Sequence, residues 1–187
     1  MKVFWFDTET TGTDPVANDI IQIAAIVEID GEIKEKINLF CQPFDYDTIQ
    51  PKALEVNGRT IEEFHSFPTP QETFKVFSKL LSKYINQYDK MDKFIPAGYN
   101  AKFDIDFLNN WFIKNGSKYF GSYFSWQPID PLFLIPILRY VGLYSEDNAK
   151  LTTVAEYFGI TFDAHDAFAD IECTKLVCEK ILQKIRE

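Results

Sequence analysis

The chain has 187 residues, of which 46% are hydrophobic and 16% aromatic, so it can bury a full core without disulfide bonds or a structural metal. Intrinsic disorder is therefore excluded, and the length predicts a single domain over residues 1–187. The 19 basic and 28 acidic residues give a net charge of −9, which excludes a protein that coats long nucleic acids through phosphate contacts. An enzyme that holds one strand end through bound metal ions is not excluded, because the cations invert the local field.

The cysteines and the N-terminus indicate the compartment. Cys41, Cys173 and Cys178 show neither CxxC spacing nor the even count of a disulfide framework, which indicates reduced thiols. The apolar run between Met1 and Asp7 is too short for a signal peptide, and no later stretch reaches the length of a membrane span. We therefore expect a soluble cytoplasmic protein with no membrane partner.

The first part of the chain predicts three consecutive strands. Residues 3–6 are apolar on both alternating faces, as in a central strand covered by helices on each side. Residues 20–29 and 33–40 form the arms of a hairpin around the turn Asp30-Gly31. Residues 44–70 contain several prolines and predict a loop without a long element. The pattern is typical of a layered α/β fold.

The rest of the chain alternates helices with short strands. A helix over residues 70–88 begins with a capping box, in which Thr69 is the N-cap, Pro70 occupies N1 and Glu72 occupies N3. Hydrophobic spacing predicts two further short strands, over residues 94–97 and 126–129, and four further helices, over residues 101–115, 130–140, 151–158 and 166–186.

The first candidate site is the carboxylate pair Asp7 and Glu9 at the end of the first strand. Residues two apart on a strand project from the same face, so the two carboxylates repel each other. A hard divalent cation such as Mg²⁺ or Mn²⁺ relieves that repulsion. The spacing also imitates a Ca²⁺ loop, but the closing Glu of such a loop would fall at Asn18, and the motif follows a strand rather than a helix.

The second candidate site lies in the segment NAKFDIDFL, which contains Asp104 and Asp106. A helical repeat of about 100° per residue places Asp104 on the inward stripe and Asp106 nearly opposite, toward solvent. That stripe is formed by Phe107, Leu108 and Trp111. A carboxylate that faces the core costs on the order of several kcal/mol unless it is paired or lies near a metal. A buried aspartate held only by ordinary hydrogen bonds is the alternative.

The third candidate site opens the last helix, at His165-Asp166-Ala167-Phe168-Ala169-Asp170. Asp166 fits the N-cap position, which leaves His165 in the preceding loop and Asp170 about one turn inside the helix. Helical projection places Asp170 at the edge of an inward apolar stripe. The other histidine, His65, lies in the proline-containing loop without an acidic cluster, and we expect it to be a structural or surface residue.

Together the three sites resemble the motifs of the DEDDh branch of the DEDD exonuclease superfamily, the DnaQ-like family that includes the epsilon proofreading subunit of bacterial DNA polymerase III. The similarity covers essentially the whole chain and implies a ribonuclease H-like α/β fold, with a central mixed five-stranded sheet flanked by helices. Its residues are Asp7-x-Glu9 within FDTETTG, Asp104 within NAKFDIDFL and His165-x-x-x-x-Asp170 within HDAFAD, with weaker similarity at Asn57-Gly58 and Asp130.

The resemblance also implies roles for individual residues. Two Mg²⁺ or Mn²⁺ ions would be held chiefly by Asp7, Glu9 and Asp170, with Asp104 completing the second ion site largely through water. His165 would deprotonate the attacking water. The expected contacts to the terminal nucleotide are Thr10, Thr11, Asn100 and Phe103. Many relatives carry a bulky apolar residue just after TTG, where this chain has Thr13, so base stacking at that position is expected to be weaker.

These implications favour a 3′→5′ exonuclease that releases nucleoside monophosphates from single-stranded nucleic acid, preferentially DNA, in proofreading or repair. The expected partners are 3′ ends of DNA or RNA and a DNA polymerase subunit. Three alternatives are open: a 3′→5′ exoribonuclease in RNA processing, a non-catalytic polymerase-associated module, and an endonuclease of the ribonuclease H type. The last of these usually lacks the His-x₄-Asp arrangement found at the last helix.

Overall fold

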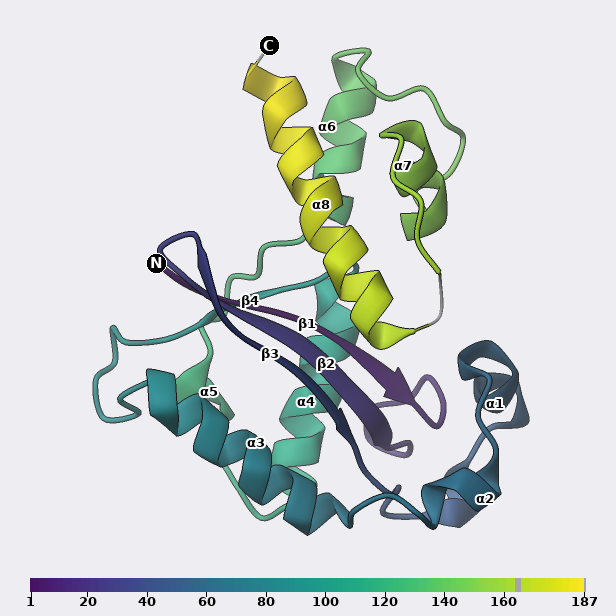
Figure 1. Ribbon diagram of the computed structural model, residues 1–187, viewed down its shortest axis with the longest axis vertical. Coiled ribbons are helices and arrows are strands. Elements are labelled where there is room, and N and C mark those ends of the chain that lie inside the picture. Colours follow the sequence, from purple (N-terminus) through teal and green to yellow (C-terminus); the bar gives the residue numbers. More distant parts are fainter. Residues whose placement is uncertain (164–165, 187) are drawn as a thin grey trace.

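The computed structural model describes residues 1–163 and 166–186, in which a mixed sheet lies between helical layers (Figure 1). The strand order is β3-β2-β1-β4, with β1 antiparallel to β2, β2 antiparallel to β3, and β4 parallel to β1. Among the described residues no helix is both long and apolar enough to cross a membrane. The strands are β1 (Lys2–Thr10), β2 (Ile20–Ile29), β3 (Glu32–Phe40) and β4 (Ile95–Ala97).

The expected fifth strand is wrong: within the described residues the sheet has four strands. The chain around residues 126–129 forms only two isolated parallel bridges beside β4, from Phe124 to Phe94, just before β4, and from Ile129 to Ala97. Between these bridges the outer segment has two residues more than β4, so it bulges outward and no continuous ladder can form. Pro128 lies in the bulge and has no amide hydrogen to donate.

Helices cover both faces of the sheet. Helices α3 (Pro70–Tyr84) and α4 (Ala101–Lys114) pack on one face, and α8 (Ala167–Arg186) packs on the other (Figure 1). The short helices α6 (Ile135–Tyr140) and α7 (Leu151–Tyr157) pack against α8 in a third apolar cluster.

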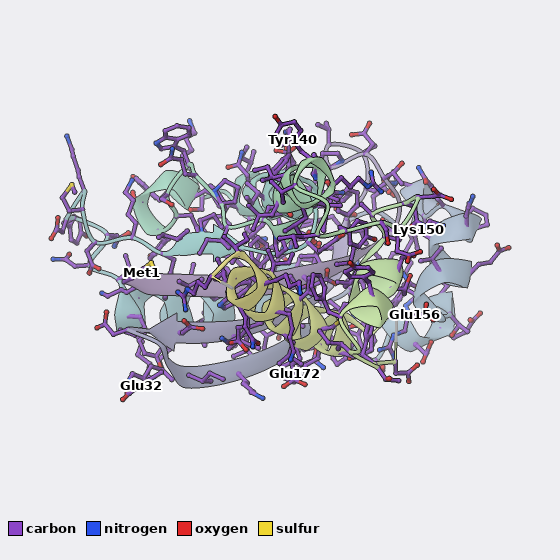
Figure 2. The ribbon with its side chains drawn as sticks, turned by 90° about the horizontal axis from the view of Figure 1, so that it is seen from above. Met1, Glu32, Tyr140, Lys150, Glu156 and Glu172 are labelled. Atoms are coloured by element: carbon purple, nitrogen blue, oxygen red, sulfur yellow. The ribbon has the colours of Figure 1, made fainter. Side chains whose placement is uncertain are left out.

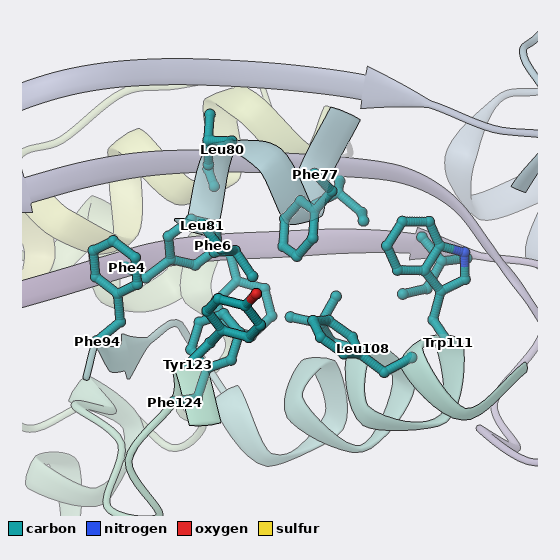
Figure 3. Packing of buried hydrophobic residues seen from close by; sticks show 14 of the residues in the cluster. Phe4, Phe6, Phe77, Leu80, Leu81, Phe94, Leu108, Trp111, Tyr123 and Phe124 are labelled. Atoms are coloured by element: carbon teal, nitrogen blue, oxygen red, sulfur yellow. The ribbon is translucent and has the colours of Figure 1, made fainter. Parts of the chain in front are cut away.

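Strand β1 separates the two main cores by alternation. Phe4 and Phe6 point toward the α3 and α4 side, where the Phe4 ring lies 5.8 Å from Phe77 and 5.4 Å from Phe94 between ring centroids (Figure 3). Val3 and Trp5 point toward α8. Because side chains alternate along a strand, the odd-numbered residues that follow must also face the start of α8.

Residues 44–70 contain short helices where the sequence predicted a loop. They are η1 (Tyr46–Thr48), α1 (Pro51–Asn57) and α2 (Ile61–Phe64). Local signals mark their ends: Pro51 occupies the first helical position, Gly58 has the positive φ of 63° that ends a helix, and Thr60 forms a capping box with Glu63. Helices of one or two turns are too short to show a helical repeat of hydrophobic residues. The spacing of hydrophobic residues therefore did not predict them.

Two helix boundaries also differ from expectation. Helix α3 ends at Tyr84 rather than residue 88, because Ile85 is extended and buried and the Asp92 carboxylate accepts a hydrogen bond from the Asn86 amide at 2.9 Å. The single helix expected over residues 130–140 is divided into η2 (Pro131–Leu134) and α6. Pro136 lacks the amide hydrogen that an unbroken α-helix would require there. A further short helix, α5 (Phe120–Tyr123), was not expected.

Candidate active site

Three carboxylates converge where β1 ends and α8 begins, which Figure 1 shows as neighbouring segments. One oxygen atom from each of Asp7, Glu9 and Asp170 lies within 4.8 Å of the other two. Asp7 and Glu9 share the strand face that points toward α8, and Asp170 lies in the first turn of that helix. The β1–β2 ladder is regular up to Glu9 and shifts its register immediately afterwards, a kind of irregularity that often adjoins functional sites. We call these three residues the acid cluster.

The N-terminus of α8 is built as the sequence predicted. The Asp166 carboxylate accepts hydrogen bonds from the amides of Phe168 and Ala169, each at 3.0 Å. This cap fixes the first turn of the helix and therefore the position of Asp170, whose own amide donates to the Asp166 carbonyl at 2.9 Å. His165, the expected general base, lies outside the described residues, so its role stays a prediction.

Asp104 faces inward, as the helical projection predicted, and is only 4% exposed. One of its oxygens accepts hydrogen bonds from the amide of Thr8 at 2.9 Å and from the Thr8 hydroxyl at 2.7 Å. These bonds tie α4 to β1 between the two strand carboxylates. Asp104 is not among the three residues whose oxygens converge, so its part in metal binding stays a prediction. Asp106 lies on the outer side of the helix and forms an ion pair with Lys102 at 2.6 Å.

The cluster strongly favours protonation or cation binding. Burial, followed by the charges of Asp170 and Asp104, raises the pKa of Glu9 from 4.5 to about 8. Burial and the neighbouring carboxylates raise the pKa of Asp7 well above its ordinary value. Burial raises the pKa of Asp104 to about 7, although the hydrogen bonds from Thr8 oppose this shift. Several carboxyl groups thus share a space that cannot easily hold all of their charges.

Asp130 is a site-building residue whose role the sequence did not reveal. It is buried, and its carboxylate accepts hydrogen bonds from three amides: Asn100 at 3.1 Å, Ala101 at 2.9 Å and Leu132 at 3.0 Å. Asn100 has a positive φ of 57° and provides no side-chain cap for α4. Asp130 therefore caps that helix from a distant segment, one turn before Asp104.

A pocket of about 260 Å³ adjoins the acid cluster through Glu9. It includes two of the residues expected to contact substrate, Thr10 and Phe103, together with residues from the segment that precedes and forms α1. Its lining residues are Thr8, Glu9, Thr10, Gly12, Thr13, Gln50, Lys52, Ala53, Val56, Asn57 and Phe103. The α1 residues were not expected at the site, because the sequence predicted no helix there.

The other two expected substrate contacts, Thr11 and Asn100, are not among the residues that line this pocket. Thr11 is fully buried, and its hydroxyl accepts a hydrogen bond from the Asp19 amide at 2.9 Å. Asn100 is exposed at the N-terminus of α4. Their contacts with substrate stay predictions. His65 stacks on Tyr46 with ring centroids 5.1 Å apart, which fits the structural role expected for it.

The sequence matches a known family over most of its length. The RNase_T family model, described as exonuclease, matches residues 4–177. The chain is 27% identical over 187 residues to the PolC-type DNA polymerase III of Bacillus cereus, and 30% identical over 174 residues to that of Halalkalibacterium halodurans. These alignments cover 97% and 90% of this chain but 11% and 10% of the polymerases. The chain therefore spans about a tenth of the length of these curated relatives.

Solved structures share the fold. The zinc-bound form of E. coli exonuclease I with single-stranded DNA matches with a TM-score of 0.80 and 24% identity, covering 100% of this chain and 41% of that one. Exonuclease I with bound product matches with a TM-score of 0.79 and 23% identity, covering 99% of this chain and 44% of that one. The expected ribonuclease H-like α/β fold is thereby confirmed, with the number of strands corrected to four in the described residues.

Proposed function

Because this chain belongs to the RNase_T exonuclease family, we propose that it is a metal-dependent 3′→5′ exonuclease that releases nucleoside monophosphates from single-stranded ends. The observation that carries the proposal is the acid cluster, in which three carboxylate oxygens lie within 4.8 Å of one another beside a pocket of about 260 Å³. A pocket next to converging carboxylates suits a terminal nucleotide whose phosphodiester bond must reach the metal ligands.

The donor set fits hard divalent cations. Asp7, Glu9 and Asp170 offer only oxygen ligands. The pKa of Glu9 is raised by burial and then by the negative charges of neighbouring carboxylates, which a cation would neutralise. These three would hold Mg²⁺ or Mn²⁺, with Asp104 contributing to a second ion site. When bound there, such ions would supply positive charge to the attacking and leaving oxygens of a phosphodiester displacement.

The chain's own groups have distinct tasks in this proposal. His165 accepts the proton of the attacking water, since an imidazole with an ordinary pKa of about 6.5 can take up a proton near neutral pH. Thr8 and Asp130 hold Asp104 and its helix against β1. Phe103 and Thr10, which line the pocket, contact the terminal nucleotide. Thr11 and Asn100 are proposed as further contacts to that nucleotide. Residues 1–187 would form a single exonuclease domain.

DNA is the favoured substrate, in proofreading or repair. The relatives are DNA polymerases, and the structural neighbours include exonuclease I bound to a DNA oligonucleotide. By analogy with the polymerase relatives, the proposed partner is a DNA polymerase and the proposed compartment is the cytoplasm. The partner and the compartment are inferred from the relatives, whereas the reaction is inferred from the residues of the site.

Degradation of oligonucleotides labelled at the 5′ end tests the proposal. With Mg²⁺ or Mn²⁺, single-stranded DNA should give a ladder that shortens stepwise from the 3′ end, and RNA of the same sequence should be degraded more slowly. Faster degradation of RNA would favour an exoribonuclease, and internal cuts would indicate an endonuclease. If neither nucleic acid is cut with either metal, the domain is a non-catalytic module and the proposal fails.

A further inference from the structure

A second groove lies at the other end of β1, far from the acid cluster. It has a volume of about 760 Å³ and includes residues from the beginnings of β1 and β4 and from the loops beside them. We call it the distal groove and define it by Lys2, Lys90, Met91, Lys93, Phe120 and Trp126. Met1, which also lines it, lies at the opposite end of the molecule from Glu156 of α7 (Figure 2).

The distal groove carries a local positive charge on an acidic protein. Lys2 is neutralised by Asp92 at 2.5 Å. Within residues 1–163 and 166–186, neither Lys90 nor Lys93 forms an ion pair, and the Lys93 ammonium donates to the Gly121 carbonyl, which leaves its charge uncompensated. Asp89, whose carboxylate accepts a hydrogen bond from the Met91 amide at 2.9 Å, lies beside Lys90 in the sequence and reduces this charge. The groove therefore carries a modest positive charge, from Lys90 and Lys93, on a chain of net charge −9, which favours an anionic ligand.

Exposed aromatic surface accompanies these lysines. Trp126 is 86% exposed, whereas Trp5 and Trp111 are 5% and 2% exposed. It lies in the outward bulge between the two bridges to β4, whereas Phe124 is only 2% exposed and Phe120 packs against the same apolar core. The face of Trp126 is thus available beside the lysines, an arrangement typical of surfaces that stack a base and contact the phosphates of single strands.

The edge of β4 argues against an extended peptide as the ligand. The amides of Ser125 and Ile129 donate to the carbonyls of Phe94 and Pro96 at 2.8 and 2.9 Å. The outer segment therefore already occupies the positions on β4 through which an added peptide strand would pair. A nucleic acid does not need those positions, because it binds through base stacking and phosphate contacts.

We propose that the distal groove binds the upstream, 5′ part of a single-stranded nucleic acid whose 3′ end occupies the acid cluster. This inference rests on the proposed function for the direction of the strand. The nine residues of β1 span roughly 30 Å at about 3.3 Å per residue. Because β1 is buried, a nucleic acid must follow the surface around it, so at least about nine stacked nucleotides are needed to join the two sites. Only strands longer than that reach both sites.

Tryptophan fluorescence of the full chain tests binding directly when Ca²⁺ replaces Mg²⁺, so that a hard cation is available to the acid cluster while cleavage is suppressed. Since Trp126 is much more exposed than the other two tryptophans, iodide should quench mainly its emission. Oligothymidylate of about 20 nucleotides should protect it from iodide, and oligothymidylate of about four nucleotides should not. This experiment does not depend on catalysis. If oligothymidylate protects Trp126 from iodide but the protein has no nuclease activity, binding at the distal groove is supported and the proposed function is rejected.

Steady-state kinetics with Mg²⁺ then test the link to activity. Trp126→Ala combined with Lys90→Glu should raise KM for the long substrate about tenfold and leave kcat and the short substrate unchanged. Tyr140→Ala combined with Lys150→Glu is the matched control, since both residues are exposed elsewhere and should have no effect.

Three results would overturn the proposal. The first is an unchanged KM for the long substrate in the groove variant, and the second is equal protection of Trp126 by long and short oligothymidylate. The third is protection by an acidic phenylalanine-containing peptide but not by oligothymidylate, which would assign the groove to a protein partner. Circular dichroism of each variant confirms that it is folded, and Lys90→Glu alone provides a milder test if the double variant is not.

Discussion

The two ends of β1 differ in charge and in how that charge is held. At the C-terminal end, Asp7 and Glu9 meet Asp170 in a partly buried cluster where repulsion and burial raise carboxyl pKa values. At the N-terminal end, Lys90 and Lys93 lie at the surface beside exposed Trp126. Charges at the surface are screened and tolerate mutation, whereas buried like charges destabilise the fold unless a cation compensates them. Mutations in the acid cluster should therefore have larger effects on activity and stability than mutations in the distal groove.

The largest effect is expected from removing one charge of the acid cluster. Asp7→Asn or Asp170→Asn should reduce metal-dependent exonuclease activity about a thousandfold or more, which corresponds to the several kcal/mol that metal ions contribute to such transition states. The metal-free variants should unfold at temperatures equal to or higher than the metal-free wild type, because repulsion is relieved. Rate measurements and thermal melts check this pair of results.

Asp106→Asn is the matched control for those variants, since it removes an aspartate from the outer side of α4. It should retain activity within about twofold of the wild type. Wild-type activity in folded Asp7→Asn would reject the acid cluster as the catalytic centre, and an equally severe loss in Asp106→Asn would show that the effect is general electrostatics.

The distant cap of α4 should give the next largest effect. Asp130→Ala leaves three amides without their acceptor, and each buried unsatisfied amide costs about 1–3 kcal/mol unless water replaces the carboxylate. Denaturant unfolding should show a loss of a few kcal/mol in the free energy of unfolding. Asp130→Asn keeps one acceptor oxygen and should lose less.

Activity of the Asp130 variants sharpens the comparison between the two ends. If Asp130 positions Asp104, kcat should fall in the folded Asp130→Ala protein, while fluorescence protection at Trp126 stays unchanged. A normal kcat in a destabilised but folded variant would limit Asp130 to a structural role.

The pH dependence of stability provides a more moderate test. The pKa of Glu9 is raised from 4.5 to about 8 in the folded protein, so the folded state keeps a proton that the unfolded chain has already released in this range. The free energy of unfolding of the metal-free protein should therefore fall as the pH rises from about 4.5 to about 8. Melting temperatures measured with EDTA across that window check the sign.

Glu9→Gln should flatten this dependence, and Mg²⁺ should raise the melting temperature most near the upper end of the window, where protons no longer compensate the charge. Melting temperatures that rise with pH in the metal-free wild type would contradict the electrostatic description of the cluster.

The smallest effect is expected at the exposed pair of Lys102 and Asp106. Lys102→Ala removes a surface ion pair at (i, i+4) spacing, which is typically worth about 0.3–0.5 kcal/mol. Urea unfolding should show a change of that size, and it should disappear in high salt. A loss above about 1 kcal/mol would mean that the outer side of α4 contributes to the site more than its exposure suggests.

Local patterns predicted the parts of the site that depend on one element at a time. The alternation of β1 placed Asp7 and Glu9 on one face, the helical projection turned Asp104 inward, and Asp166 proved to be the cap that its position suggested. The same patterns gave the hairpin of β2 and β3 and the start of α3, because a turn or a capping box leaves a short-range signature.

Features that depend on contacts between distant segments were not predictable in this way. Asp130 caps α4 from a distance of 29 residues in the chain, so neither segment alone shows the interaction. The outward bulge around Trp126 replaced the expected fifth strand, because the spacing of its two bridges to β4 is a tertiary property. The α1 residues that line the pocket came from a segment without long periodicity.

Calorimetric titration of the wild-type protein with Mn²⁺ at pH 7, in buffers of different ionisation enthalpy, tests the central claim most directly. If the acid cluster is the metal centre, Mn²⁺ should bind and release protons, since Glu9 has a pKa of about 8 and is largely protonated before the metal arrives. Asp170→Asn should weaken binding at least about tenfold. Mn²⁺ binding that releases no protons and is unaffected by Asp170→Asn would contradict the account.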